Sequence, residues 1–135
     1  MDTNIEMCRK AVEIQVAWEP MVGDFIYDLK NNYSAIVINH HPLTYTYAFE
    51  LKNVHEFEEN ILYFNKLDDL VYCPRQDQLQ DMVETNINYL MSRFTTCMTS
   101  FQDEYIEQFR SMEQLWLAFV MDELYQKKWD GEDWI

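Results

Sequence analysis

The chain has 135 residues, with 24 acidic against 10 basic side chains and a net charge of −14. Hydrophobic residues make up 48% of it and aromatic residues 16%, enough apolar surface to offset the entropy lost on folding, which excludes a disordered acidic tail. The 2 glycines and 3 prolines disfavour a many-turned β-sandwich or a collagen-like fibre. Because this length suits one domain, we predict a single domain over residues 1–135.

The first expected element is an amphipathic helix over residues 4–18. Its apolar positions recur every three or four residues. Thr3 and Glu6 have the spacing of a capping box, in which the threonine hydroxyl would cap the first turn. Pro20 disfavours helical geometry at Glu19, so the helix is expected to end there.

Three strands are expected next, over residues 25–29, 34–39 and 44–51. Apolar and polar residues alternate in the first and third, and the second is rich in β-branched residues. The polar residues 30–32 favour a hairpin, because asparagine tolerates the left-handed backbone of tight turns. Residues 54–72 fit a short helix or an irregular segment better, although Ile61–Phe64 is also compatible with a fourth strand.

The second half of the chain predicts about three helices. One apolar stripe covers residues 79–94, and the hydroxyl-rich residues 95–100 predict a break after it. Ser111 and Gln114 form a capping box that opens the most apolar helix. The predicted fold class is therefore α+β: an N-terminal helix, a three-stranded antiparallel sheet, then about three helices packed on one face.

The sequence contains no residue pattern typical of a catalytic or metal site. His40, His41 and His55 lack the spacing of metal ligands, and neither glycine lies in a phosphate-binding loop. The cysteines, which form no Cys-x-x-Cys pair, are Cys8, Cys73 and Cys97. A reactive thiol needs a positive local field, which an acidic chain disfavours. We therefore expect no enzymatic activity, metal or cofactor, and reduced cysteines in or near the core.

The net charge bears on the class of partner. An acidic surface disfavours direct binding of nucleic acid or of an anionic membrane, and it attracts a protein partner with a basic surface. Solubility alone is the other explanation of the charge. The densest acidic stretch and two C-terminal tryptophans supply the candidate partner-binding residues, which are Glu56, Glu58, Glu59, Asp68, Asp69, Trp129 and Trp134. Packing of the C-terminal residues onto the core is the alternative interpretation of the tryptophans.

The sequence also bears on location. The N-terminal residues lack the basic and apolar regions of a signal peptide, and the longest apolar run, residues 115–121, is too short to span a bilayer. We therefore expect a cytoplasmic protein without membrane contact.

Three segments of the chain carry a resemblance. They are residues 17–24 (Ala17-Trp18-Glu19-Pro20 through Gly23-Asp24), 72–82 (Tyr72-Cys73-Pro74-Arg75 through Met82) and 109–121 (including Ser111 and Trp116), the last running on into 128–134 (Lys128-Trp129-Asp130-Gly131-Glu132-Asp133-Trp134). These segments resemble small uncharacterised proteins encoded in phages and prophages of Gram-positive bacteria. The C-terminal segment is the most specific. These proteins carry no assigned activity or site residues, so the resemblance implies only a setting, the cytoplasm of a phage-infected bacterium.

The functional prediction is a small acidic accessory phage protein that acts by binding another protein. A sharper hypothesis is that it inhibits a host defence or nucleic-acid-binding protein, as an anti-CRISPR protein does, with carboxylates that mimic the phosphates of DNA or RNA. The alternative is a structural protein that assembles into a homo-oligomer through exposed aromatic residues. An unrecognised enzyme is the third hypothesis.

Overall fold

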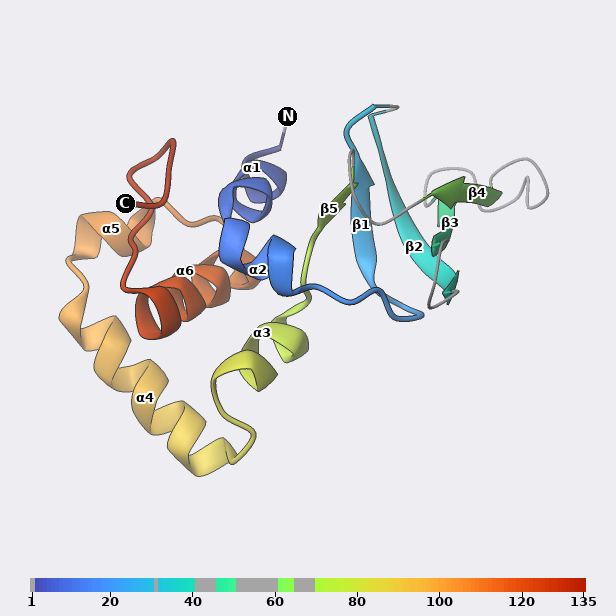
Figure 1. The fold of residues 1–135 in the computed structure, drawn as a ribbon. Helices are drawn as coiled ribbons and strands as arrows, with labels where there is room; N and C mark the ends of the chain where they lie inside the picture. The colour runs from blue at the N-terminus through green and yellow to red at the C-terminus, as the bar shows by residue number, and fades with distance from the viewer. Residues whose placement is uncertain (1, 31, 41–45, 51–60, 65–69) are drawn as a thin grey trace. The chain divides into compact units, whose positions relative to one another are not determined.

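The computed structural model describes residues 2–30, 32–40, 46–50, 61–64 and 70–135. The chain forms two compact units (Figure 1). The helical unit consists of Met1–Ala11 and Pro74–Ile135, and the sheet unit consists of Val12–Cys73. The sheet unit is thus inserted in the sequence between the two parts of the helical unit. Helices and an antiparallel sheet together confirm the predicted α+β class.

The sheet unit contains helix α2 (Val12–Ala17) and a five-stranded antiparallel sheet. Its strands, in the spatial order β4-β3-β2-β1-β5, are β1 (Phe25–Asp28), β2 (Tyr33–His40), β3 (Thr46–Glu50), β4 (Ile61–Phe64) and β5 (Leu70–Tyr72). The three predicted strands are confirmed as the consecutive neighbours β1, β2 and β3. The expectation of a helix or irregular segment over residues 54–72 is wrong where β4 and β5 extend the sheet (Figure 1). A short apolar run is compatible with a helix or a strand. Here β4 pairs with β3 and β5 pairs with β1, so both segments form strands.

The β1–β2 hairpin has the turn that its asparagines predict. Asn32 adopts a positive φ of 58° and donates its N–H to the carbonyl of Asp28 at 2.8 Å. Beyond this turn Ile26 stands opposite Ala35 in the ladder, and both side chains are buried. The hairpin therefore buries one of its faces in the sheet unit, and that face carries the Asp28 carboxylate beside Ile26.

The helical unit is built around its last helix. Its helices are α1 (Thr3–Lys10), α3 (Gln76–Val83), α4 (Ile87–Ser100), α5 (Asp103–Glu107) and α6 (Met112–Tyr125). Helix α6 contacts α1, α3 and α4, and all six residues from 116 to 121 are buried. Phe94 of α4 stacks on Trp116 and meets Phe119 edge-on. The helix that the sequence predicts to be the most apolar is therefore the core of the unit.

The expected single helix over residues 4–18 is wrong, because the chain leaves helical geometry at Ala11. Alanine is the best helix former, so local propensity does not explain the break, which falls where the chain passes from one unit to the other. The expected cap is also wrong: Asp2, not Thr3, accepts the N–H of Asn4, at 2.7 Å. A carboxylate caps as well as a hydroxyl and is favoured by the helix dipole.

The break expected at residues 95–100 is wrong as well, since α4 continues to Ser100. The hydroxyls of Thr96 and Thr99 donate to the carbonyls of Ser92 and Thr95 four residues earlier, so they are satisfied within the helix. The interruption lies instead before α4, where the side chain of Asn86 caps its first turn. The expected single stripe over residues 79–94 therefore belongs to two helices, α3 and α4.

Ser111 caps α6 as the sequence predicts, but the predicted capping box is only half formed. The Ser111 hydroxyl accepts the N–H of Gln114 at 3.1 Å. The side-chain carbonyl of Gln114 in turn accepts the N–H of Arg110 at 2.7 Å, one residue before the cap. No helix in the described part of the chain is both long enough and apolar enough to cross a bilayer.

Candidate protein-binding surface

The residues that follow α6 fold into a small hairpin, here called the C-terminal hairpin (residues 128–135). Lys128 and Ile135 exchange two backbone hydrogen bonds of 2.8 and 2.9 Å, and Trp129 pairs with Trp134 through an antiparallel bridge. The two indole rings lie 5.1 Å apart. Backbone pairing and ring packing together hold the hairpin.

The tip of this hairpin is a tight acidic turn. The Asp130 carboxylate accepts the backbone N–H groups of Glu132 and Asp133 at 2.8 and 2.7 Å. The hydrogen bonds from Asp133 and then Glu132 lower the pKa of Asp130 below its usual value. Gly131 adopts a φ of +107°, a conformation that favours glycine. The turn thus presents its carboxylates at the surface in a fixed backbone frame.

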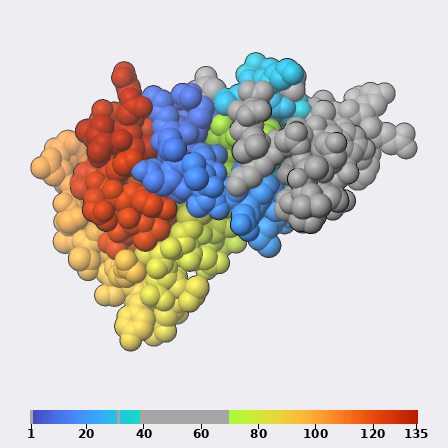
Figure 2. Space-filling model, viewed as in Figure 1, coloured from blue at the N-terminus to red at the C-terminus, as the bar shows by residue number. Residues whose placement is uncertain are grey.

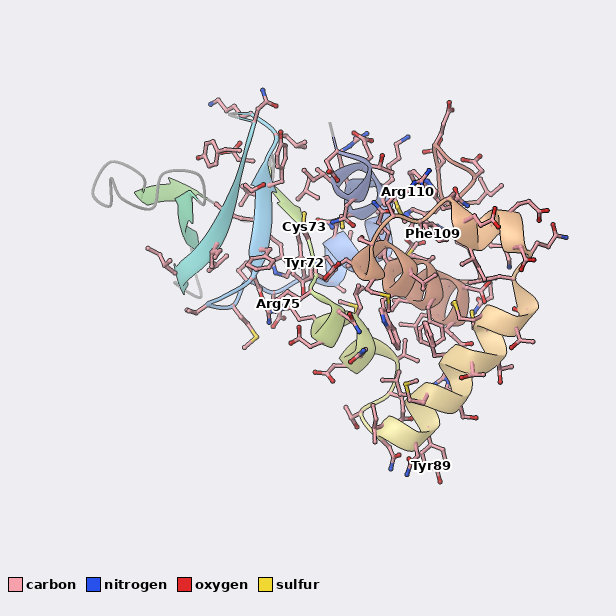
Figure 3. The ribbon with its side chains drawn as sticks, turned by 180° about the vertical axis from the view of Figure 1, so that it is seen from behind. Tyr72, Cys73, Arg75, Tyr89, Phe109 and Arg110 are labelled. Atoms are coloured by element: carbon pink, nitrogen blue, oxygen red, sulfur yellow. The ribbon has the colours of Figure 1, made fainter. Side chains whose placement is uncertain are left out.

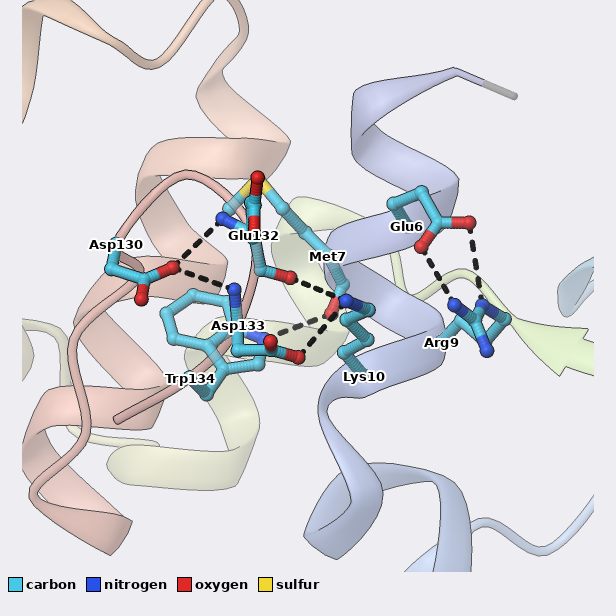
Figure 4. A network of polar contacts seen from close by, with 8 residues as sticks. All are labelled: Glu6, Met7, Arg9, Lys10, Asp130, Glu132, Asp133 and Trp134. Atoms are coloured by element: carbon cyan, nitrogen blue, oxygen red, sulfur yellow. Dashed lines mark hydrogen bonds and ion pairs between the residues drawn. The ribbon is translucent and has the colours of Figure 1, made fainter.

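The C-terminal hairpin is anchored to α1 (Figure 4). The Trp134 indole N–H donates to the carbonyl of Met7 at 2.9 Å. Lys10 donates to the backbone carbonyl of Glu132 at 2.7 Å and pairs with the Asp133 carboxylate at 2.9 Å. Figure 2 shows the C-terminal residues, in red, against the first residues of the chain, in blue.

Helix α5 lies on another side of the same hairpin. The Tyr105 hydroxyl accepts the backbone N–H of Trp129 at 3.0 Å, and Gln108 reaches the carbonyl of Trp129 at 3.5 Å. Burial raises the pKa of Tyr105 to about 12, so this phenol is neutral at physiological pH. The contacts place α5 next to the acidic turn.

Helix α5 also carries three exposed carboxylates. Asp103, Glu104 and Glu107 are exposed and take part in no ion pair of the described residues. We call these three carboxylates and those of the exposed Asp130 and Glu132 of the neighbouring hairpin the acidic surface. The sequence does carry a signal for it, since the spacing of residues 103, 104 and 107 places them near one another on a helix. It was missed because longer acidic stretches lie elsewhere.

The basic side chains of the helical unit are largely engaged. Five of its seven pair with carboxylates at 2.8 to 3.1 Å, namely Arg9 with Glu6, Lys10 with Asp133, Arg75 with Asp77, Arg93 with Glu123 and Lys128 with Asp122. The hydrogen bond from Arg9 is the main reason that the pKa of Glu6 is lowered. Few cations therefore remain to balance the acidic surface.

The two candidate tryptophans are in the interior. Trp129 is 4% exposed and Trp134 is 8% exposed, so both rings pack as the core interpretation expects. They offer little surface in this conformation, and their contact with a partner stays a prediction. The exposed part of the segment is the acidic turn between them.

The other candidates cannot be placed. Glu56, Glu58, Glu59, Asp68 and Asp69 lie outside the described residues, as do His41 and His55. For His40 the structure describes only the backbone, as the end of β2.

The expectation of packed cysteines holds for two of the three. Cys8 and Cys97 are buried, and Cys73 is partly exposed. Burial, together with a 3.4 Å hydrogen bond from the Cys97 thiol to the Asp122 carboxylate, raises the pKa of Cys97 to about 12. Cys97, Asp122 and Glu123 hold their donor atoms within 4.8 Å of one another, yet Lys128 already pairs with the first carboxylate and Arg93 with the second.

The segments for which the sequence predicts a resemblance to phage proteins have structural roles, and the resemblance itself stays a prediction. The Trp18 indole donates to the buried Asp24 carboxylate at 2.9 Å and stacks on Tyr72. The backbone N–H of Arg75 donates to the Gln78 side chain at the start of α3. No protein-family model, curated protein or solved structure matches the chain.

Proposed function

We propose that this protein acts by binding a partner protein with a basic surface, and that the acidic surface on α5 and the C-terminal hairpin makes part of the contact. The observation that carries the proposal is the imbalance within the helical unit: most of its basic side chains are already paired, whereas the carboxylates of the acidic surface are exposed and outside any ion pair of the described residues. No catalytic step is part of the proposal.

Unpaired carboxylates favour a basic partner for two reasons. They steer it over distances of about a Debye length, roughly 8 to 10 Å, and they form charge-assisted hydrogen bonds with Lys and Arg on contact. Nucleic-acid-binding proteins are partners of this kind, because they present basic grooves to the phosphates of DNA or RNA. In its specific form, the proposal is that the partner is a host defence protein with such a groove. The chain would inhibit this partner in the cytoplasm of a phage-infected bacterium, in the way that an anti-CRISPR protein inhibits its target.

The experiment compares two double variants that remove equal charge. Asp103→Asn with Glu107→Gln removes two of the five carboxylates of the acidic surface. Asp81→Asn with Glu113→Gln removes two exposed carboxylates on α3 and α6 as the matched control. The tagged full chain is used to capture proteins from a Gram-positive bacterial lysate over a salt series, with quantification by mass spectrometry. A captured basic protein that is lost with salt and with the α5 variant, yet retained by the control, supports the proposal.

Two results would contradict it. One is capture that survives several hundred millimolar salt unchanged, because screening weakens contacts between exposed charges. The other is equal loss in both double variants, which would mean that overall charge matters and the acidic surface does not.

The alternative is a homo-oligomer, and one observation favours it. Ile87, Tyr89 and Met91 near the beginning of α4 are 61%, 66% and 46% exposed. Tyr89 lies at the outer end of this helix (Figure 3). Exposed apolar residues that gather on one element are typical of interaction sites. Sedimentation that stays monomeric at all concentrations would contradict assembly.

A further inference from the structure

Strand β5 forms one edge of the sheet, with β1 as its only neighbour among the described strands. Tyr72 stands opposite Ile26, and the N–H of Cys73 donates to the carbonyl of Phe25 at 2.8 Å. In an antiparallel ladder, hydrogen-bonded and non-hydrogen-bonded pairs alternate. The bond at Cys73 therefore makes Tyr72 a non-hydrogen-bonded residue, so its N–H and carbonyl face away from β1, toward the open edge.

Both of these outward groups are held by one side chain of α2. The Gln15 amide donates to the carbonyl of Tyr72 at 2.8 Å and accepts the N–H of Tyr72 at 2.9 Å. This amide offers one donor and one acceptor side by side, as the backbone of a neighbouring strand would. Tyr72 itself is labelled at β5 in Figure 3.

A second contact fixes the same tyrosine. The Trp18 ring stacks on the Tyr72 ring, with centroids 5.1 Å apart and planes within 7°. The Trp18 indole N–H is fixed in turn by Asp24, at 2.9 Å. Helix α2 and the segment after it therefore hold β5 at its backbone and at its side chain.

We propose that Gln15 is an edge cap: its side-chain amide occupies the hydrogen-bonding groups of Tyr72 and so prevents β5 from pairing with the β5 strand of a second copy. Open edges bind other strands readily, and natural proteins block them with charges, bulges or covering segments. In this protein the side-chain amide of Gln15 covers the edge at Tyr72. The cap uses residues of the sheet unit alone, so it is independent of the proposed function.

The wild-type protein provides the first test. By NMR, the side-chain amide protons of Gln15 are expected to exchange with solvent about three- to tenfold more slowly than those of Gln102. Gln102 is the matched control, because it is exposed and its side chain makes no capping hydrogen bond. Equal exchange rates for the two glutamines would overturn the proposal.

The second test removes the cap. Gln15→Ala is compared with Val16→Ala, a truncation of a 75% exposed side chain on the same helix. In dilute Gln15→Ala the Tyr72 N–H is expected to exchange about three- to tenfold faster, and at higher concentration this variant alone should sediment as a dimer. A folded Gln15→Ala that sediments as Val16→Ala does would overturn the cap. If Gln15→Ala does not fold, the wild-type exchange rates alone decide.

Discussion

The helical unit and the sheet unit carry the same net charge but accommodate it differently. The helical unit has 14 acidic and 7 basic residues and the sheet unit has 10 and 3, which leaves −7 on each. In the helical unit, carboxylates pair with Lys and Arg at the surface. In the sheet unit, Asp24 and Asp28 are buried, at 3% and 4% exposure, and accept hydrogen bonds from backbone N–H groups and an indole.

This difference shows that net charge is a poor guide to what a carboxylate does. An exposed ion pair contributes little to stability, about 0 to 1 kcal/mol. The fold of the helical unit therefore depends little on its surface charges, which leaves them available for binding. A buried carboxylate that satisfies several donors is structural, because its loss leaves those donors without acceptors. The acidic surface, for which we propose a role in binding, and the buried Asp24 thus place the same chemical group in two different environments.

The largest expected effect tests whether the helical unit depends on its core more than on its ion pairs. Phe119→Ala removes a fully buried ring from α6 and should lower the free energy of unfolding by about 3–5 kcal/mol. Met112→Ala, on the exposed side of the same helix, should change it by less than about 0.5 kcal/mol. Urea unfolding measures both, and the single-domain prediction expects one cooperative transition. Similar losses in the two variants would contradict this account of the core.

A smaller effect is expected from the buried carboxylate of the sheet unit. Asp24→Ala leaves the Trp18 indole N–H and the Met21 backbone N–H without their acceptor, so the free energy of unfolding should fall by about 1–3 kcal/mol. The exposed neighbour Glu19 supplies the control, since Glu19→Ala should have almost no effect. Equal unfolding midpoints for the two variants would remove the distinction between buried and exposed acids.

The anchoring of the C-terminal hairpin should contribute less. Trp134→Phe keeps most of the ring but deletes the 2.9 Å hydrogen bond to the carbonyl of Met7, at an expected cost of about 0.5–1.5 kcal/mol. Ile135→Ala changes a 72% exposed side chain and is the control. If Trp134→Phe unfolds at the same urea concentration as Ile135→Ala, the indole bond does not hold the hairpin.

The smallest expected effect is on the pH dependence of the acidic turn. The pKa of Asp130 is lowered in the folded protein, so its carboxylate supports the turn above the ordinary aspartate pKa, and this support is lost as the pH falls through the lowered value. The amide signals of Glu132 and Asp133 should therefore shift with an inflection below about pH 3.9. Asp130→Asn keeps the acceptor oxygen and should abolish this inflection. An inflection at or above the ordinary pKa would contradict the bonding at the tip.

Local patterns predicted those elements whose residues all favour one structure. Strand β1, the asparagine turn and the Ser111 cap each appear in the structure. The alternation in β1 misled about its side, because the structure buries Ile26 and Asp28 and leaves Phe25 exposed. The patterns failed where the same residues are compatible with two local structures. Thr96 and Thr99 can break a helix or bond back to it, and Ile61–Phe64 can be helix or strand.

The candidate site was only partly accessible from the sequence. Its acidic character follows from composition, and Trp129 and Trp134 of the hairpin were candidates from the sequence, although the structure buries both. The contribution of α5 was not predicted, because the hydrogen bonds that join Tyr105 and Gln108 to Trp129 span more than twenty residues of the sequence. Gln15 gave no signal, since a glutamine between apolar helix positions is ordinary.

The sequence by itself determined the α+β class, the negative charge and the apolar face of α6, because each depends on composition or on periodicity within one segment. Only the tertiary structure decided where the first helix breaks, at Ala11, and that β5 forms one edge of the sheet. It also decided which carboxylates are buried and which are exposed. These outcomes depend on partners distant in the chain, whose contacts outweigh local preferences of a few tenths of a kcal/mol to about 1 kcal/mol per residue.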